Sequence, residues 1–390
     1  MKILLISISL VIGFISCNPI NRSYIEESWD IVAHWKIIKE DSVIVADVDK
    51  VKAKMNIPLD VLVEDYSVVK LDNKALLTHR MSDAFISDNF IAISCYSYHP
   101  LKLFKKDGTF IGDIGSLGPE EKQYDCIHDI QIDEKNNKVY ILPAYLSNPN
   151  RILVYDLQGT LLSEIPLINK VRVGGSFKIN TSKNEITVIN TSTKLLPNPF
   201  RVWIQDLNGN LIKGIPANKA SIDIPISGTM TSNHTEAMEM FLMYGGNSTG
   251  EYLYHYDDKK NKLVPKFHVK TQENRIFIYE LPFHYIIEVV SLLYNNTPKF
   301  IVHKKTLKGC QFTGFVTPEG LLLDQYAILN GCHDGYFSLV EQESRILEQI
   351  QKIDKNNLTK EQIKNLNQLQ RMIEEDEEDG YLLFMAKFKK

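Results

Sequence analysis

The chain has 390 residues, of which 44% are hydrophobic, 24% charged and 10% aromatic. This composition is typical of a globular protein and excludes a disordered or collagen-like chain. The formal net charge of -4 offers no general attraction to phosphate backbones, so a nucleic-acid partner is not expected.

The N-terminus has the pattern of an export signal. A lysine precedes an apolar run, residues 3–15, that is too short to span a bilayer comfortably. A serine stands directly before Cys17, as in a bacterial lipobox, so residues 1–16 are predicted to be a lipoprotein signal peptide and Cys17 to carry the acyl lipid. The alternative is an ordinary signal peptide that contains a cysteine. Asn18 and the residues after it include no acidic pair, which favours the outer membrane and leaves the periplasmic or surface face open.

The other cysteines are too few and too scattered for a disulfide framework. They are Cys95, Cys126, Cys310 and Cys332, and none has C-x-x-C spacing, so a redox or zinc-knuckle role has no support. Export permits disulfides, and the pair Cys310 and Cys332 is the better candidate for a bridge.

A repeat of about fifty residues runs through the chain, and its period identifies the fold. Residues 101–111, 152–162 and 202–212 share one plan of strand, tight turn and strand, with weaker copies at 252–261 and 300–309. Gly108, Gly159 and Gly209 lie 51 and 50 residues apart, where a short hairpin turn needs a positive φ. The repeat therefore predicts evenly spaced β-hairpins.

A second strand pair precedes each of these hairpins, most clearly at 127–133 and 138–142. Four antiparallel strands in each repeat predict an all-β, six-bladed β-propeller. The sixth blade is expected from residues 317–340, including 320–323 and 326–329, with outer strands drawn from 66–71 and 381–388.

Helical spacing interrupts the β pattern near the C-terminus. Thr359 followed by Gln362 predicts a capping box for the second of two helices. The expected organisation is a signal peptide (1–16), a lipid tether and N-terminal segment (17–59), a propeller (60–340), a two-helix insertion (341–379) and a closing strand of the propeller (380–390).

The sequence resembles the six-bladed β-propeller lipoproteins related to NHL-repeat propellers. The resemblance covers roughly residues 60–390, and its best part is the hairpin at Phe104, the Gly115–Pro119 segment and the strand pair that ends at Leu142. After Pro119 this chain lacks the third glycine that is usual in the family. The resemblance implies the fold but no agreed catalytic residues.

Propellers bind ligands at the mouth of the central channel, so candidate ligand residues should repeat with the blades. His128, His234, His284 and His333 are 106, 50 and 49 residues apart, and Asp129 and Asp334 adjoin two of them. Such a ring of imidazoles could bind a transition metal, although the histidines do not share one phase relative to the turns. No nucleophile, zinc, phosphate-loop or dinucleotide motif is present, so no catalytic residue and no cofactor beyond the lipid is predicted.

Three functions are consistent with this sequence. The leading hypothesis is a lipoprotein of the cell envelope that acts as a non-catalytic binding or scaffold propeller for a glycan, a peptide or a partner protein. The second is a metal-dependent lyase or hydrolase with its site at the channel mouth. The third is a structural subunit of an outer-membrane complex.

Overall fold

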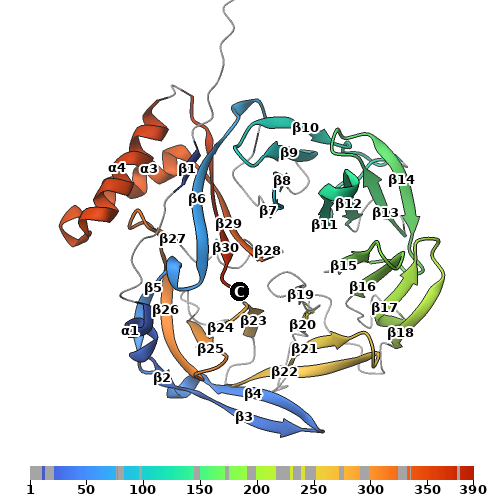
Figure 1. Cartoon of the computed structure of the whole chain (residues 1–390), viewed down its shortest axis with the longest axis horizontal. Coiled ribbons are helices and arrows are strands. Elements are labelled where there is room, and N and C mark those ends of the chain that lie inside the picture. The colour runs from blue at the N-terminus through green and yellow to red at the C-terminus, as the bar shows by residue number, and fades with distance from the viewer. Residues whose placement is uncertain are drawn as a thin grey trace, which may run out of the picture.

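The protein is a ring of six sheets around a central axis (Figure 1). The structure, a computed structural model, describes residues 11–13, 22–75, 77, 83–95, 99–120, 122–144, 150–171, 175–190, 199–216, 229–231, 239–241, 252–271, 276–289, 298–323, 332–333, 335–375 and 378–390. Each sheet has a core of four antiparallel strands, so the predicted six-bladed propeller is confirmed.

Five blades use four consecutive strands each, ordered from the axis outwards. Blade 2 contains β7 (Asp83–Ile86), β8 (Phe90–Ser94), β9 (Leu101–Lys105) and β10 (Phe110–Ile114); blade 3 contains β11 (Ile127–Asp133), β12 (Lys138–Pro143), β13 (Arg151–Tyr155) and β14 (Leu161–Pro166). Blade 4 contains β15 (Gly175–Asn180), β16 (Glu185–Asn190), β17 (Phe200–Asp206) and β18 (Leu211–Pro216). Blade 5 contains β19 (Thr229–Thr231), β20 (Glu239–Phe241), β21 (Tyr252–Asp257) and β22 (Lys262–Lys270). Blade 6 contains β23 (Ile276–Glu280), β24 (His284–Val289), β25 (Lys299–His303) and β26 (Lys308–Val316).

Blade 1 closes the ring with strands from both ends of the chain. It contains β28 (Cys332–His333), β29 (Tyr336–Gln342), β30 (Tyr381–Phe388) and β6 (Val63–Leu71), and β1 (Val11–Gly13), inside the predicted signal peptide, pairs with β6. The segment 320–323 differs from the prediction. Its strand β27 (Leu322–Leu323) pairs with β26 of blade 6, because a tight turn at Gly320, with φ of 82°, folds it back. Residues 326–329 lie outside the described residues.

The segment before β6 extends the two preceding blades. It forms α1 (Arg22–Glu27), β2 (Asp30–Ile31), β3 (Ala33–Ile38), β4 (Asp41–Asp47) and β5 (Lys54–Pro58). Strand β4 runs parallel to β22 of blade 5, and β5 runs parallel to β26 of blade 6. Much of the predicted tether thus lies along the outside of two blades. Short 3-10 turns lie at Val48–Lys50, Leu59–Val61, Asn73–Ala75, Glu134–Asn136 and Lys355–Asn357.

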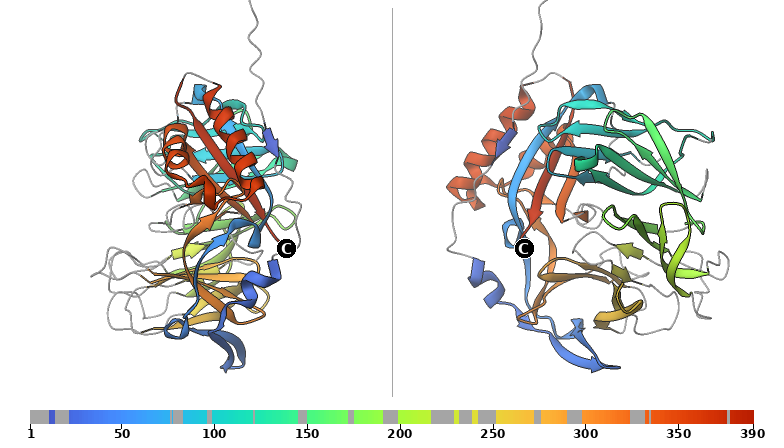
Figure 2. Two further views of the ribbon diagram at one scale, coloured as in Figure 1. Left: turned by 90° about the vertical axis from the view of Figure 1, so that its left-hand side faces the viewer. Right: turned by 45° about the vertical axis from the view of Figure 1, so that its right-hand side comes forward.

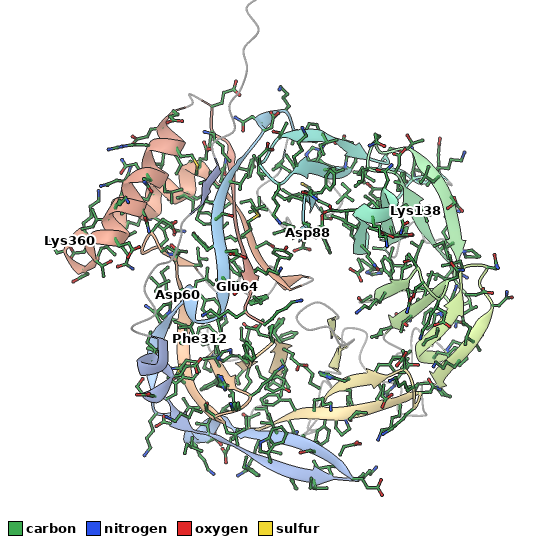
Figure 3. The ribbon with its side chains drawn as sticks, viewed as in Figure 1. Asp60, Glu64, Asp88, Lys138, Phe312 and Lys360 are labelled. Carbon is green, nitrogen blue, oxygen red and sulfur yellow. The ribbon has the colours of Figure 1, made fainter. Side chains whose placement is uncertain are left out.

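Apolar clusters between neighbouring sheets hold the ring together. They join blades 1 and 2, 2 and 3, 3 and 4, 5 and 6, and 6 and 1. Side chains fill the space between the ribbons, with Phe312 in blade 6, Lys138 in blade 3 and Lys360 at the start of α4 (Figure 3). The three predicted turn glycines have φ values of 83–88°, so the repeat was interpreted correctly at its turns.

Two helices pack on the outside of the ring beside blades 1 and 6 (Figure 2). They are α3 (Glu343–Lys352) and α4 (Lys360–Glu374), and the predicted capping box is formed by Thr359 and Gln362. Leu366 and Leu369 of α4 are fully buried in the core between these blades. None of the helices that the structure describes is long and apolar enough to cross a bilayer.

Candidate functional site

A cavity of about 1020 Å³ opens on the propeller axis, where the innermost strands of blades 2, 3, 4 and 6 end. We call this cavity the mouth. Every blade contributes to its lining: Tyr336 from blade 1, Asp88 from blade 2, Gln131 from blade 3, Lys178 from blade 4, His255 from blade 5 and Phe283 from blade 6. A cavity of this size accommodates a drug-sized or oligomeric ligand.

An aromatic side chain is presented to the mouth by the turn between β23 and β24. The Leu281 N–H donates to the His284 carbonyl oxygen at 2.8 Å and closes a turn that contains Pro282 and Phe283. Phe283 is 44% exposed and lines the mouth. An exposed ring on a closed turn is a pre-formed stacking surface, because its backbone is already ordered.

A buried carboxylate in the mouth orients two basic side chains. Glu280 accepts from His255 Nε2 at 2.5 Å through one oxygen and from Lys304 Nζ through the other. Burial raises the pKa of Glu280, but the hydrogen bonds and charges of His255 and Lys304 outweigh this effect and lower the pKa. Lys304 Nζ also lies 4.8 Å from the centroid of the Tyr285 ring. Glu280 is therefore ionised, and both of its carboxylate oxygens accept hydrogen bonds. These bonds hold His255 and Lys304 at the rim of the mouth.

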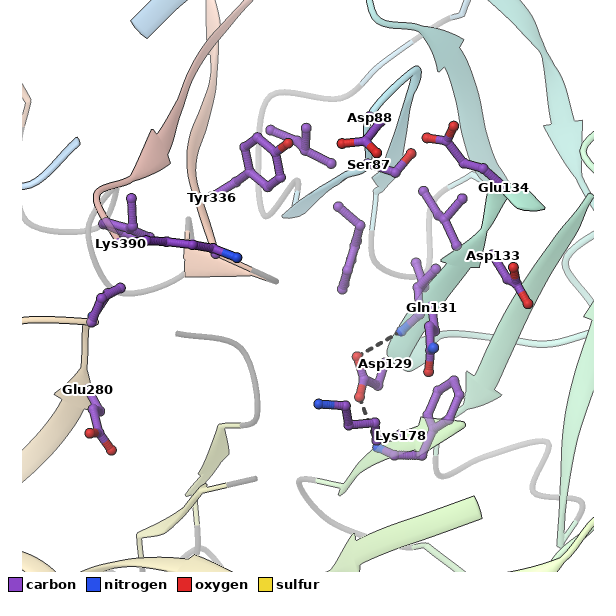
Figure 4. Close-up of a pocket in the computed structure, with 18 of the residues that line it drawn as sticks. Ser87, Asp88, Asp129, Gln131, Asp133, Glu134, Lys178, Glu280, Tyr336 and Lys390 are labelled. Carbon is purple, nitrogen blue, oxygen red and sulfur yellow. Dashed lines mark hydrogen bonds between the residues drawn. The ribbon is translucent and has the colours of Figure 1, made fainter. Parts of the chain in front are cut away.

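Acidic side chains gather on the blade 2 and blade 3 side of the mouth, across from Glu280 and Lys390 (Figure 4). Burial raises the pKa of Glu134, but hydrogen bonds from Ser87 and Asn89 outweigh it and leave the pKa lowered. Asp88 lies on the same side and faces the opening. The mouth thus offers carboxylate acceptors on one side and basic donors on the other.

Asp129, a residue predicted to bind ligand, lines the mouth, but its carboxylate accepts hydrogen bonds that stabilise the fold. It is buried and accepts from Ser176 Oγ at 2.5 Å and from the Phe177 N–H at 3.0 Å, across the boundary between blades 3 and 4. Gln131, two residues further along β11, makes a second hydrogen bond between the same blades, because its side-chain oxygen accepts from the Ile179 N–H at 2.9 Å. Asp129 therefore joins the inner strands of two blades.

The structure does not gather the four predicted histidines. His128 lies on β11, but it is absent from the lining of the mouth, and burial lowers its pKa to about 4. Within the described residues its Nε2 has no hydrogen-bond partner. His333 is placed on β28, although its side chain is not described, and His234 and Asp334 lie outside the described residues.

His284 lies on the side of blade 6 that faces α1, in a cluster that we call the latch: Glu26, His284 and His303. Glu26 Oε1 is 2.9 Å from His284 Nε2, and Glu26 Oε2 is 3.7 Å from His303 Nε2. The two imidazole rings are 4.8 Å apart and perpendicular. Burial raises the pKa of Glu26, but the hydrogen bond and charge of His284, with the nearby charges of His303 and Lys389, outweigh this effect and lower the pKa. Burial lowers the pKa of His284, and the hydrogen bond and charge of Glu26 offset this effect only in part.

The latch has the residue types of a metal site, and its ligand atoms lie within 4.8 Å of one another. Its hydrogen bonds argue against metal. His303 Nδ1 accepts the backbone N–H groups of Lys305 and Thr306 at 3.0 and 3.1 Å, so this nitrogen carries no proton. The proton of the neutral ring is then on Nε2, the atom that would have to bind the metal. The latch is best explained as a hydrogen bond from His284 to the Glu26 carboxylate with the His303 imidazole close beside it.

The predicted bridge between Cys310 and Cys332 is wrong, because Cys310 is a free thiol. Cys310 lies opposite Ile301 inside blade 6, whereas Cys332 is on the innermost strand of blade 1. Burial raises the pKa of Cys310 to about 12, which keeps the thiol protonated and unreactive.

Comparison with known proteins agrees with this architecture. Residues 38–173 match the model of a family described as a six-bladed β-propeller, which confirms the resemblance seen in the sequence. No curated protein matches the sequence.

One of the solved structures to which the chain is similar supports the same fold. A protein of Bacteroides fragilis described as exported has a TM-score of 0.59 at 14% identity, over 89% of this chain and 100% of that one. A DUF4221 family member from Bacteroides vulgatus has a TM-score of 0.46 at 11% identity, over 84% and 97%. The periplasmic gluconolactonase of Pseudomonas aeruginosa has a TM-score of 0.37 at 9% identity, over 77% and 94%. The chain is thus a β-propeller with a neighbour described as exported, and these distant similarities do not bear on activity.

Proposed function

We propose that the protein is an exported lipoprotein of the cell envelope, anchored through an acylated Cys17, that binds a ligand at the mouth without catalysis. The observation that carries the proposal is the mouth itself, a cavity to which all six blades contribute and in which Phe283 is exposed. The serine before Cys17 and the apolar run of residues 3–15 support the anchor, and the outer membrane is its expected location.

A glycan is the ligand class that this lining fits best. The face of a sugar ring packs on an aromatic side chain, as Phe283 offers, and its hydroxyl groups need acceptors and donors around that ring. Asp88 on one side and Lys304 on the other supply them. Peptides and a partner protein are the other candidate ligands of a binding or scaffold propeller.

The test is a glycan and peptide array probed with the mature chain and two matched variants. Phe283→Ala removes the exposed ring in the mouth, whereas Leu322→Ala removes an equally exposed side chain, also 44%, that does not line it. We expect Phe283→Ala to lose about tenfold or more in affinity for the glycans that bind, and Leu322→Ala to bind normally. Equal binding by both variants, or no binding by the mature chain, would contradict a ligand site at the mouth.

The alternative function, a metal-dependent lyase or hydrolase, needs ligand atoms that are free to converge on a metal in the mouth. His255 and Lys304 both donate hydrogen bonds to Glu280 there, which disfavours such a site. Elemental analysis of protein purified without chelator or added metal distinguishes the two functions. One metal per chain would favour the enzyme.

A further inference from the structure

The three most exposed large apolar side chains that the structure describes lie within seven residues of the chain, two of them on the hairpin formed by β3 and β4. Ile31 is 72% exposed, Ile37 is 68% exposed and Trp35 is 54% exposed. Trp35 and Ile37 belong to β3, which the turn at residues 39–40 joins to β4, whereas Ile31 ends the preceding strand β2, which pairs with β26 of blade 6. Single exposed apolar residues are ordinary on a protein surface, but three within seven residues form a patch that needs a partner.

The hairpin stands out from the body of the propeller. Strand β3 is the last strand of its sheet in the described part of the chain, and Figure 1 shows it at the outer rim, beyond β22 and β4. Successive side chains of a strand point to opposite faces, and residues 34–37 are all exposed, so both faces of β3 are in solvent. Trp35 and Ile37 share one face, and Lys36 is on the other.

We infer that this hairpin, β3 with its flanking Ile31, inserts its apolar side chains into the surface of the membrane that holds the lipid anchor. The inference rests on the proposed function, because the anchor on Cys17 supplies the membrane.

Chain length favours a membrane over a protein partner. Glu26 is fixed to blade 6 through the latch, and eight residues separate it from Cys17. Because the last four of these belong to α1, the segment spans at most about 25 Å. The hairpin begins only a few residues after Glu26, so the bilayer that receives the acyl chains is within reach of it. Tryptophan and lysine together are also the residue types found at membrane–water interfaces.

The tryptophans make the contact directly measurable. The chain has three, of which Trp29 and Trp203 are buried and only Trp35 is exposed. Insertion of Trp35 into lipid would shift the fluorescence emission to the blue and expose the ring to quenching by brominated lipid. The emission of the buried Trp29 and Trp203 should not change.

The experiment uses the mature chain with Cys17→Ser, which has no lipid, and vesicles of phosphatidylethanolamine with phosphatidylglycerol. We expect co-sedimentation with the vesicles, a blue shift, and binding that persists at high salt because the contact is apolar. Trp35→Ser and Ile37→Ser should each weaken binding about tenfold. The control Ile212→Ser, a 48% exposed side chain on blade 4, should not change it.

Three results would overturn the inference: no vesicle binding, an equal loss in the Ile212→Ser control, or self-association of the chain through β3 that Trp35→Ser abolishes. These failures are distinct from failure of the proposed function. The mass of the protein purified from membranes reports the lipid on Cys17, and the Phe283→Ala variant reports the mouth, independently of the hairpin.

Discussion

Substitution of Glu26 by glutamine should release the N-terminal helix from blade 6. The variant removes the carboxylate charge that accepts a hydrogen bond from the buried His284 and that lies 3.7 Å from His303 Nε2. A hydrogen bond to a charged group contributes about 1.5–3 kcal/mol. Because Glu26 is partly exposed, we count only its hydrogen bond to His284 and not the longer contact with His303. A loss of about 2 kcal/mol makes local opening roughly thirtyfold more frequent.

Acid should have the same effect on the unmodified protein. The pKa of His284 is lowered from 6.5, so its contribution to docking is complete above pH 6.5 and is lost as the pH falls below that value. The pKa of Glu26 is lowered from 4.5, so its contribution is lost on further acidification. The charge of Lys304 also lowers the pKa of His284, and the charge of Lys389 also lowers the pKa of Glu26.

Hydrogen exchange measured by mass spectrometry on the peptide that covers residues 22–32 tests both statements. After correction for the intrinsic pH dependence, protection of this peptide should fall between pH 7.5 and 5, and Glu26→Gln should abolish most of it already at neutral pH. Strand β13 in blade 3 is the control and should not change. Equal protection in both proteins, or a fall that is the same in β13, would refute the latch.

The remaining predictions concern stability, measured as the shift in thermal midpoint. Gly108→Ala should destabilise by about 1–3 kcal/mol, because the new Cβ would lie 2.1 Å from a backbone oxygen of β6 at a positive φ, whereas Gly112→Ala, with nothing within 4 Å, should be tolerated. Ser176→Ala should cost about 1.5–3 kcal/mol, since it removes a donor from the buried Asp129, and Ser176→Thr should recover part of the loss. Thr359→Ala should cost about 1 kcal/mol through the helix cap, and Thr359→Ser should be nearly neutral.

The fold was predictable because it repeats. Turn glycines such as Gly108 recur with the blade, and each blade needs the same tight turn at the same place, so local signals add along the chain. The two-residue strand at Leu322 was placed in the wrong blade because such a short strand carries no pattern that specifies its partner.

The mouth could not be predicted in the same way. His255 lies on β21, Glu280 on β23 and Lys304 just after β25. Their separations of 25 and 24 residues do not show that they meet, and only the closed ring brings them together.

The hairpin between β24 and β25 relates the latch to the mouth. His284 and His303 are paired across these strands and face Glu26. The adjacent residues, Phe283 and Lys304, are joined by a backbone hydrogen bond of 2.8 Å, and both line the mouth. Phe283 and Lys304 directly adjoin the two strands, so one strand pair places residues of the mouth on one side and the contact with the helix on the other.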